Sequence, residues 1–214
     1  MKRRTLDILF SGGGLGLAGL LAILGLVLAS NAKFARTYVK NQLSAQKIMF
    51  KSVDKLTSEE KEFTKKNSGC LVTYAGQPLS TGKQAECYAN EFIGFHLKNL
   101  PNANGKTYSE LGDVQGELRS KITAAQASSD PALPALQKQL TDTTAVRETV
   151  FKGEMLRGAL LTSFGFGDLG EKASQASQVA YAAAALLALL SFAGFLHAFV
   201  TPKSKAFAPV ETAT

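Results

Sequence analysis

The sequence is poor in the residues that catalysis and metal binding most often use. Its 214 residues include only two cysteines and two histidines. Cys70 and Cys87 do not form a C-x-x-C redox motif, and no histidine accompanies them at the spacing of a zinc site. The sequence also lacks G-x-S-x-G, H-E-x-x-H, Walker A and kinase motifs. We therefore expect a protein that is not an enzyme and has no cofactor, metal or small-molecule substrate.

Two G-x-G-x-x-G matches do occur, at Gly14, Gly16 and Gly19 and at Gly165, Gly167 and Gly170. A dinucleotide site needs this motif between a strand and a helix of a βαβ unit. The first match lies in an apolar run and the second follows a helical pattern. Neither is expected to bind a cofactor.

Charge is absent from two long stretches. No Asp, Glu, Lys or Arg occurs between Ile8 and Ser30, or between Val179 and Val200. A helix of about 20 apolar residues crosses the hydrocarbon core of a bilayer. We predict transmembrane helices at residues 8–30 and 177–200. The first also resembles a signal peptide, but apolar signal segments contain about 7–15 residues, so we expect it to be retained.

Basic residues flank both predicted spans at the chain ends: Lys2, Arg3, Arg4, Lys203 and Lys205. Short cytoplasmic flanks are enriched in Lys and Arg. The sequence therefore predicts cytoplasmic tails at residues 1–7 and 201–214 and an extracytoplasmic domain at residues 31–176. Both cysteines lie in this domain, where thiols usually pair, so we predict a Cys70–Cys87 disulfide.

More basic residues follow the first span: Lys33, Arg36, Lys40, Lys47, Lys51 and Lys55. They have two interpretations. One is contact with anionic lipid head groups or an acidic partner; the other, which we favour from sequence, is the solvated face of a helix. The net charge of +7 is too dispersed for a nucleic-acid surface.

Helical patterns fill the predicted extracytoplasmic domain, so the expected fold class is all-α. The first membrane helix continues to about Gln46, and an extended connection follows at residues 48–50. Helix starts are expected at Thr57, Thr81 and Thr107. The helix at residues 82–99 has two adjacent apolar stripes and is predicted to be the most buried. Residues 70–80 are expected to be irregular.

Further helices are predicted from Pro131, through Leu133, Leu136 and Leu140, and at residues 144–164. The apolar run at residues 155–166 is interrupted by Arg157, so Met155 and Arg157 are expected in the core or at the membrane surface. Gly165, Gly167 and Gly170 are predicted to break the helix. Together these five residues form an expected interfacial elbow.

Three ionisable residues occupy apolar surroundings. We expect His96 to be a satisfied core or surface histidine. His197 lies late in the second span, where an ionisable group is a candidate functional residue, although a neutral interfacial histidine is favoured. Glu91 lies on the crowded helix at residues 82–99 and is expected to pair with Arg147 or Arg157.

Small residues recur at helical spacing in the first span, at Gly12, Gly16 and Gly19 with Ala18 and Ala22. Such stripes allow close packing of membrane helices. The expected partner is either the second span, with its Ala182–Ala185 run, or a helix of another protein.

The whole chain resembles an uncharacterised family of two-span membrane proteins from actinobacteria. The matching segments are residues 9–14 (LFSGGG), 43–50 (LSAQKIMF), 74–77 (YAGQ), 81–85 (TGKQA), 88–93 (YANEFI), 107–108 (TY) and 150–158 (VFKGEMLRG). The resemblance implies an actinobacterial source and the same topology. It implies no catalytic residue.

These observations lead to two functional hypotheses. The favoured one is a non-catalytic accessory subunit of a larger membrane assembly, for which the respiratory chain supercomplex is a candidate; its partners would be integral membrane proteins and lipids. The alternative is an extracytoplasmic sensor, or a module that binds a lipid or envelope ligand.

Overall fold

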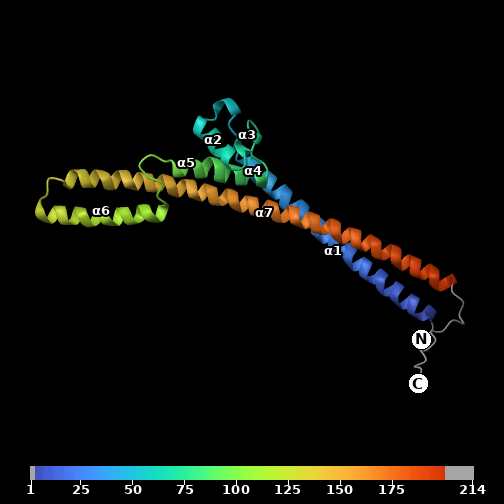
Figure 1. Ribbon diagram of the computed structural model, residues 1–214. Helices are drawn as coiled ribbons and strands as arrows, with labels where there is room; N and C mark the ends of the chain where they lie inside the picture. Colours follow the sequence, from blue (N-terminus) through green and yellow to red (C-terminus); the bar gives the residue numbers. More distant parts are fainter. Residues whose placement is uncertain (1–2, 201–214) are drawn as a thin grey trace, which may run out of the picture. The chain divides into compact units, whose positions relative to one another are not determined.

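The regular structure of this protein is helical. A computed structural model describes residues 3–200, and no strand occurs within them. The elements are α1 (Arg3–Ala45), η1 (Val53–Lys55), α2 (Ser58–Lys66), α3 (Cys70–Thr73), α4 (Gly82–Cys87), η2 (Tyr88–Ile93), α5 (Gly94–Lys98), α6 (Tyr108–Ser128) and α7 (Leu133–Val200) (Figure 1). The all-α prediction is confirmed. Lys2 and the predicted tail at residues 201–214, with Lys203 and Lys205, lie outside the described residues.

Helices α1 and α7 are both long and apolar enough to cross a membrane. The chain divides into two compact units. One contains the residues up to Arg36 together with those from Leu169 onward, and the other is Thr37–Asp168. We call them the paired-helix unit and the helical domain.

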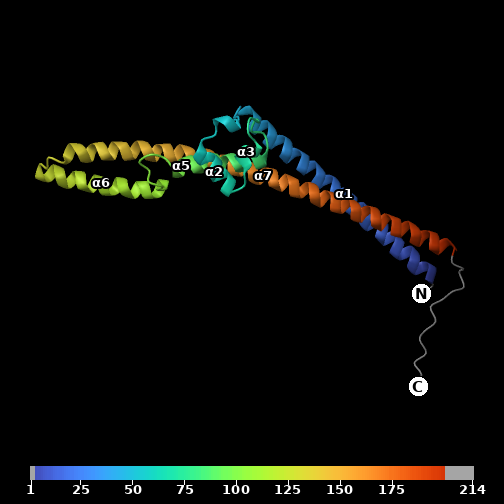
Figure 2. The ribbon, with the colours of Figure 1, turned by 45° about the horizontal axis from the view of Figure 1, so that its top comes forward.

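The paired-helix unit consists of the N-terminal part of α1 and the C-terminal part of α7, which lie side by side in both views (Figures 1 and 2). Its buried positions are occupied by small side chains: Ser11, Ala18, Ala32, Ala35, Ser177, Ala180, Ala184, Ser191 and Ala198. Small residues allow two helix backbones to approach closely, and this packing needs no large core side chain.

Capping boxes start three helices of the helical domain. Thr57 pairs with Glu60 at α2, Thr81 with Gln84 at α4, and Thr107 with Glu110 at α6. In each box the threonine side chain accepts from the backbone N–H three residues later, and the acidic or amide side chain accepts from the threonine N–H. The three predicted helix starts are confirmed.

The core of the helical domain surrounds α4 and η2, as the double apolar stripe predicted. Leu79, Ala85 and Ala89 have no exposed surface. The ring of Phe50 lies 5.6 Å from that of Tyr74 and 5.4 Å from that of Tyr88. The extended connection at residues 48–50 runs against residues 77–79, since Phe50 N donates to Gln77 O at 3.0 Å and Leu79 N to Ile48 O at 2.9 Å.

The predicted helix at residues 82–99 forms as one stretch, α4–η2–α5, but its middle was not anticipated. Residues Tyr88–Ile93 form a π-helical segment, and Gly94 N donates to Ala89 O, five residues back. Such wide turns are uncommon and occur frequently at functional sites. Residues 70–80 are mostly irregular as expected, except for the short helix α3.

Helix α6 packs along the N-terminal part of α7. Leu111 and Leu118 are buried, and the contact also contains a polar chain. Gln115 Nε2 donates to Thr144 Oγ1 at 2.7 Å, and Arg147 Nη1 donates to Gln115 Oε1 at 2.7 Å.

The predicted helices through Leu133, Leu136 and Leu140 and at residues 144–164 are helical, but the predicted start at Pro131 and the predicted breaks are wrong. Pro131 lies in the turn before α7, and α7 continues from Leu133 through the glycines without a break. Glycine costs a helix about 1 kcal/mol relative to alanine, and close packing offsets this cost here. A Cβ built at Gly167 would lie 3.3 Å from the Cα of Gly82. Gly167 therefore permits backbone contact within the helical domain, and the elbow does not form.

The disulfide that the sequence predicted joins Cys70, at the start of α3, to Cys87, at the end of α4. The Cα atoms are 5.9 Å apart and the cysteines are separated by 17 residues in the chain. Because closing such a loop restricts the unfolded chain, we expect C70S/C87S to lower the free energy of unfolding by roughly 3 kcal/mol. Urea denaturation in detergent, followed by circular dichroism, measures this loss.

Reduction provides the control for this prediction. Dithiothreitol should lower the urea midpoint of the wild type to that of C70S/C87S and leave the variant unchanged. Equal midpoints for the oxidised wild type and the variant would contradict a stabilising role.

Candidate functional site

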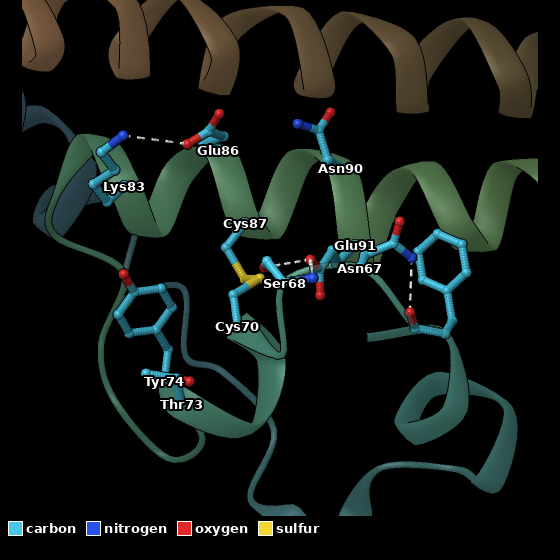
Figure 3. Close-up of a pocket in the computed structure, with 11 residues that line it drawn as sticks. Asn67, Ser68, Cys70, Thr73, Tyr74, Lys83, Glu86, Cys87, Asn90 and Glu91 are labelled. Atoms are coloured by element: carbon cyan, nitrogen blue, oxygen red, sulfur yellow. Dashed lines mark hydrogen bonds and ion pairs between the residues drawn. A yellow bond between two sulfur atoms is a disulfide. The ribbon is translucent and has the colours of Figure 1, made fainter. Parts of the chain in front are cut away.

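A surface pocket of about 530 Å³ lies beside the disulfide in the helical domain (Figure 3). Its volume falls in the range of small-ligand sites. Its walls come from α2, α3, α4 and η2, and they consist of Phe63, Asn67, Ser68, Cys70, Thr73, Tyr74, Lys83, Glu86, Cys87, Asn90 and Glu91. The disulfide thus holds together two walls of the pocket.

Glu91 is the most enclosed acidic group of this pocket. Its carboxylate accepts hydrogen bonds from the Thr64 hydroxyl, from Ser68 N at 3.0 Å and from Ser68 Oγ at 2.5 Å. These donors are neutral, so the buried carboxylate is satisfied without a cation. The predicted pairing of Glu91 with Arg147 or Arg157 is wrong.

The directions of two neighbouring side chains in η2 account for this difference. Asn90 points toward α7 and Glu91 toward the loop between α2 and α3 (Figure 3). Arg157 Nη2 therefore donates to Asn90 Oδ1 at 3.3 Å and Arg157 Nη1 to Glu154 at 3.3 Å. Arg147 belongs to the contact with α6, as described above.

The sulfurs of Cys70 and Cys87 and a carboxylate oxygen of Glu91 lie within 4.8 Å of one another. Cysteine binds metals and attacks substrates as a thiolate, and both sulfurs are held in the disulfide. With the disulfide formed, the carboxylate of Glu91 is the one metal ligand that these three residues can supply. The other pocket side chains include the rings of Phe63 and Tyr74 as well as polar groups, among them Lys83, whose Nζ lies 3.8 Å from Glu86. The pocket can therefore offer both hydrogen bonds and aromatic contacts to a small molecule.

A second buried carboxylate, Glu60, connects α2 to its neighbours. Its side chain is fully buried and accepts from Lys51 Nζ at 2.8 Å, from Thr57 N at 2.8 Å and from His96 Nε2 at 3.2 Å. His96 Nδ1 also lies 2.7 Å from Phe92 O. Both ring nitrogens therefore lie beside oxygen atoms. His96 is satisfied, as predicted, but the sequence did not indicate that Glu60 is its partner.

The environment of Glu60 sets its ionisation. Burial raises the pKa of this carboxyl group, while the hydrogen bonds from Lys51 and Thr57 and the charges of Lys51 and His96 lower it. The second group of effects is larger, so the pKa of Glu60 lies below its ordinary value of 4.5. The carboxylate is therefore held in its charged form.

In the paired-helix unit, charged residues coincide at both ends of the two apolar segments. At one end His197 Nδ1 lies 3.1 Å from Asp7 Oδ2, and Arg4 lies 5.7 Å from the centre of the Phe199 ring. At the other end Gly170 packs against α1, because a Cβ built on it would lie 2.9 Å from the Cβ of Ala35. This contact brings Glu171 and Lys172 level with Lys33 and Arg36. The charge-free segments at residues 8–32 and 173–196 are therefore in register.

The glycines of α1 divide between two faces. A Cβ on Gly14 would lie 2.5 Å from Ser191 Oγ, and one on Gly25 would lie 2.8 Å from the Tyr181 ring. These glycines face α7. For Gly12, Gly16 and Gly19, no atom of the described chain beyond the adjacent residues and the nearby backbone of α1 itself would come within 4 Å of an added Cβ. The prediction that this stripe packs on the chain's own second span is wrong, and packing on another protein stays a prediction.

The five residues of the predicted elbow have separate surroundings. Met155 is exposed, Arg157 contacts Asn90, and Gly165 faces open space among the described residues. Gly167 and Gly170 make the close contacts described above.

No known protein family, curated protein or solved structure matches this chain.

The buried position of Glu60 leads to a prediction about acid stability. Because its folded-state pKa is lowered, its stabilising contribution is complete above pH 4.5 and is lost as the pH falls through the folded-state pKa. E60Q should lower the free energy of unfolding at pH 7 by about 1–3 kcal/mol. The difference between wild type and E60Q should shrink below pH 4.5, as measured by urea denaturation at several pH values.

E62Q is the matched control, because Glu62 lies on the same helix and forms an exposed ion pair with Lys66 at 2.6 Å. It should change the urea midpoint little. A pH-independent difference between wild type and E60Q would contradict the assigned role of the Glu60 charge.

Proposed function

We propose that this protein is a two-span membrane protein that acts as a non-catalytic accessory subunit of a larger membrane assembly. The observation that carries the proposal is the open glycine face of α1. Gly12, Gly16 and Gly19 leave room for a helix that the described chain does not supply. In lipid, helices associate through such small-residue faces because close backbone packing replaces the hydrophobic driving force.

The matched ends of the paired-helix unit support the membrane placement. Charged side chains are costly in the hydrocarbon core and are placed at its borders. Residues 8–32 rise roughly 35 Å along a helix, which is enough to cross a bilayer. The charges at both ends of this segment have counterparts on α7 at the same levels.

The proposed topology places both termini in the cytoplasm and the helical domain outside. Support comes from Arg4 at the N-terminal end of the pair, following the preference for basic cytoplasmic flanks. The Cys70–Cys87 disulfide also supports it, since disulfides persist in oxidising compartments.

The candidate host assembly is the respiratory chain supercomplex of an actinobacterium. This part of the proposal rests on the resemblance of the sequence to an actinobacterial family and on the small-residue face of α1. Mass spectrometry of the copurifying proteins identifies the host assembly.

Filling the open face tests the subunit role. We expect the wild type to copurify with integral membrane proteins in mild detergent, identified by mass spectrometry, and G12V/G16V/G19V to lose them. The variant should remain folded because the added side chains meet no atom of the described chain within 4 Å of their Cβ positions.

L17V/L24V is the matched control, since both leucines are exposed and lie on a different arc of α1. It should retain the copurifying proteins. Recovery of the wild type only as a free monomer, or full retention of partners by the glycine variant, would contradict the proposal.

Topology is tested separately by labelling intact cells with a membrane-impermeant maleimide in a C70S/C87S background. Because Ser128 is exposed in the helical domain, S128C should react from outside, whereas S204C in the C-terminal tail should react only after lysis. The opposite pattern would reverse the assigned orientation.

The pocket beside the disulfide favours a second candidate function, a binding module for a small ligand. Polar side chains such as Asn67, Lys83 and Asn90 line it together with the rings of Phe63 and Tyr74, so it fits a small envelope ligand that has both polar and apolar groups. Native mass spectrometry of the purified protein tests for such a ligand. Retention by the wild type and loss in N67A/N90A would support this function.

A further inference from the structure

Basic side chains gather at one end of the paired-helix unit. Lys33 and Arg36 are the first charged residues of α1 after Asp7, and Glu171 and Lys172 are the last of the described part of α7, apart from His197. The contact of Gly170 with Ala32 and Ala35 places the four charges at one level. We call Lys33, Arg36 and Lys172 the basic collar.

The two basic residues of α1 lie beside the helix contact, with their side chains exposed. At 3.6 residues per turn, Lys33 and Arg36 point about 60° apart. Both are exposed, whereas Ala32 and Ala35 between and beside them are buried against α7. Within the described chain neither Lys33 nor Arg36 forms an ion pair. Their charges therefore face outward.

We propose that the basic collar binds the head groups of anionic phospholipids in the leaflet next to the helical domain. The inference rests on the membrane placement proposed above, because it puts the collar at the border of the hydrocarbon core. At this border the phosphate groups of the lipids lie within reach of long basic side chains.

The chemistry of the collar fits a phosphate ligand. The Arg36 guanidinium can donate two parallel hydrogen bonds to phosphate oxygens, and Lys33 supplies a point charge beside it. Glu171 is adjacent to Lys172 in α7 and Asp168 precedes Lys172 by about one helical turn, so the positive charge of the group comes mainly from Lys33 and Arg36. A zwitterionic head group carries a positive charge that balances its negative phosphate, so the basic collar attracts it less.

The orientation of the protein gives a further reason. Basic residues are usually depleted from non-cytoplasmic flanks, yet the proposed outer flank carries three. Anionic lipid head groups in the outer leaflet would neutralise these basic residues. An acidic partner protein is the competing explanation, and the experiment separates the two.

The test uses the full-length protein in nanodiscs that contain equal amounts of dioleoylphosphatidylglycerol and dioleoylphosphatidylcholine. Native mass spectrometry counts the lipids of each kind that remain bound after release. The wild type should retain phosphatidylglycerol in preference to phosphatidylcholine. K33Q/R36Q should reduce this preference roughly 10- to 30-fold, given the contribution expected of two basic residues near a charged surface.

The matched control is K61Q/R119Q, which removes one exposed lysine and one exposed arginine from the helical domain. It should keep the wild-type preference. The absence of a preference in the wild type, or its persistence in K33Q/R36Q, would overturn the proposal. Loss of a copurifying acidic protein from K33Q/R36Q with no lipid preference in the wild type would assign the collar to that protein instead.

Failure of the lipid-binding proposal can be distinguished from failure of the accessory-subunit proposal. Lipid preference is measured on the isolated chain, and it should persist in G12V/G16V/G19V whether or not the wild type has protein partners. If the wild type copurifies with partners but shows no lipid preference, only the collar proposal fails.

Discussion

The close approach of α1 and α7 at small residues is the contact on which the paired-helix unit depends. Gly14, Gly25 and Gly170 each leave room that a side chain of the facing helix occupies. These contacts set the register of the two helices. The register in turn aligns the ends of both charge-free segments, at Asp7 with His197 and at Gly170 with Ala35. The proposed membrane placement and the proposed lipid contact of the basic collar both depend on this alignment.

In the helical domain, two buried carboxylates make the contacts that hold separate segments together. An unpaired buried charge is strongly destabilising, so Glu60 and Glu91 require donors from several segments. Glu60 is contacted by Lys51, Thr57 and His96, and Glu91 accepts hydrogen bonds from Thr64 and Ser68. These hydrogen bonds attach α2 to the α4–η2–α5 stretch, and the disulfide attaches α3 to the same stretch. The pocket lies among these attachments, and its walls are held by them.

Features that depend on near neighbours in the chain were predictable. The end of α1, the capping boxes at Thr57, Thr81 and Thr107 and the extended connection at residues 48–50 follow from local hydrogen bonding and periodicity. Features that depend on distant contacts were not. The glycines at residues 165–170 indicated a break because glycine weakens an isolated helix, but α7 continues through them, and Gly167 and Gly170 make close contacts with Gly82 and Ala35. Glu91 was assigned to an arginine because a carboxylate on a crowded helix needs a partner, but its partners are the neutral donors Thr64 and Ser68.

The sequence by itself determined the all-helical class, the two apolar helices and the cysteine pair. Hydrophobic length, helical periodicity and the small number of cysteines are properties of the chain that no later packing alters. Only the tertiary structure decided which glycines face the chain's own helix and which remain open. Spacing places Gly12, Gly16 and Gly19 on one face, but the partner of a face depends on the rotation of each helix about its axis. That rotation is set by the side chains on both helices together.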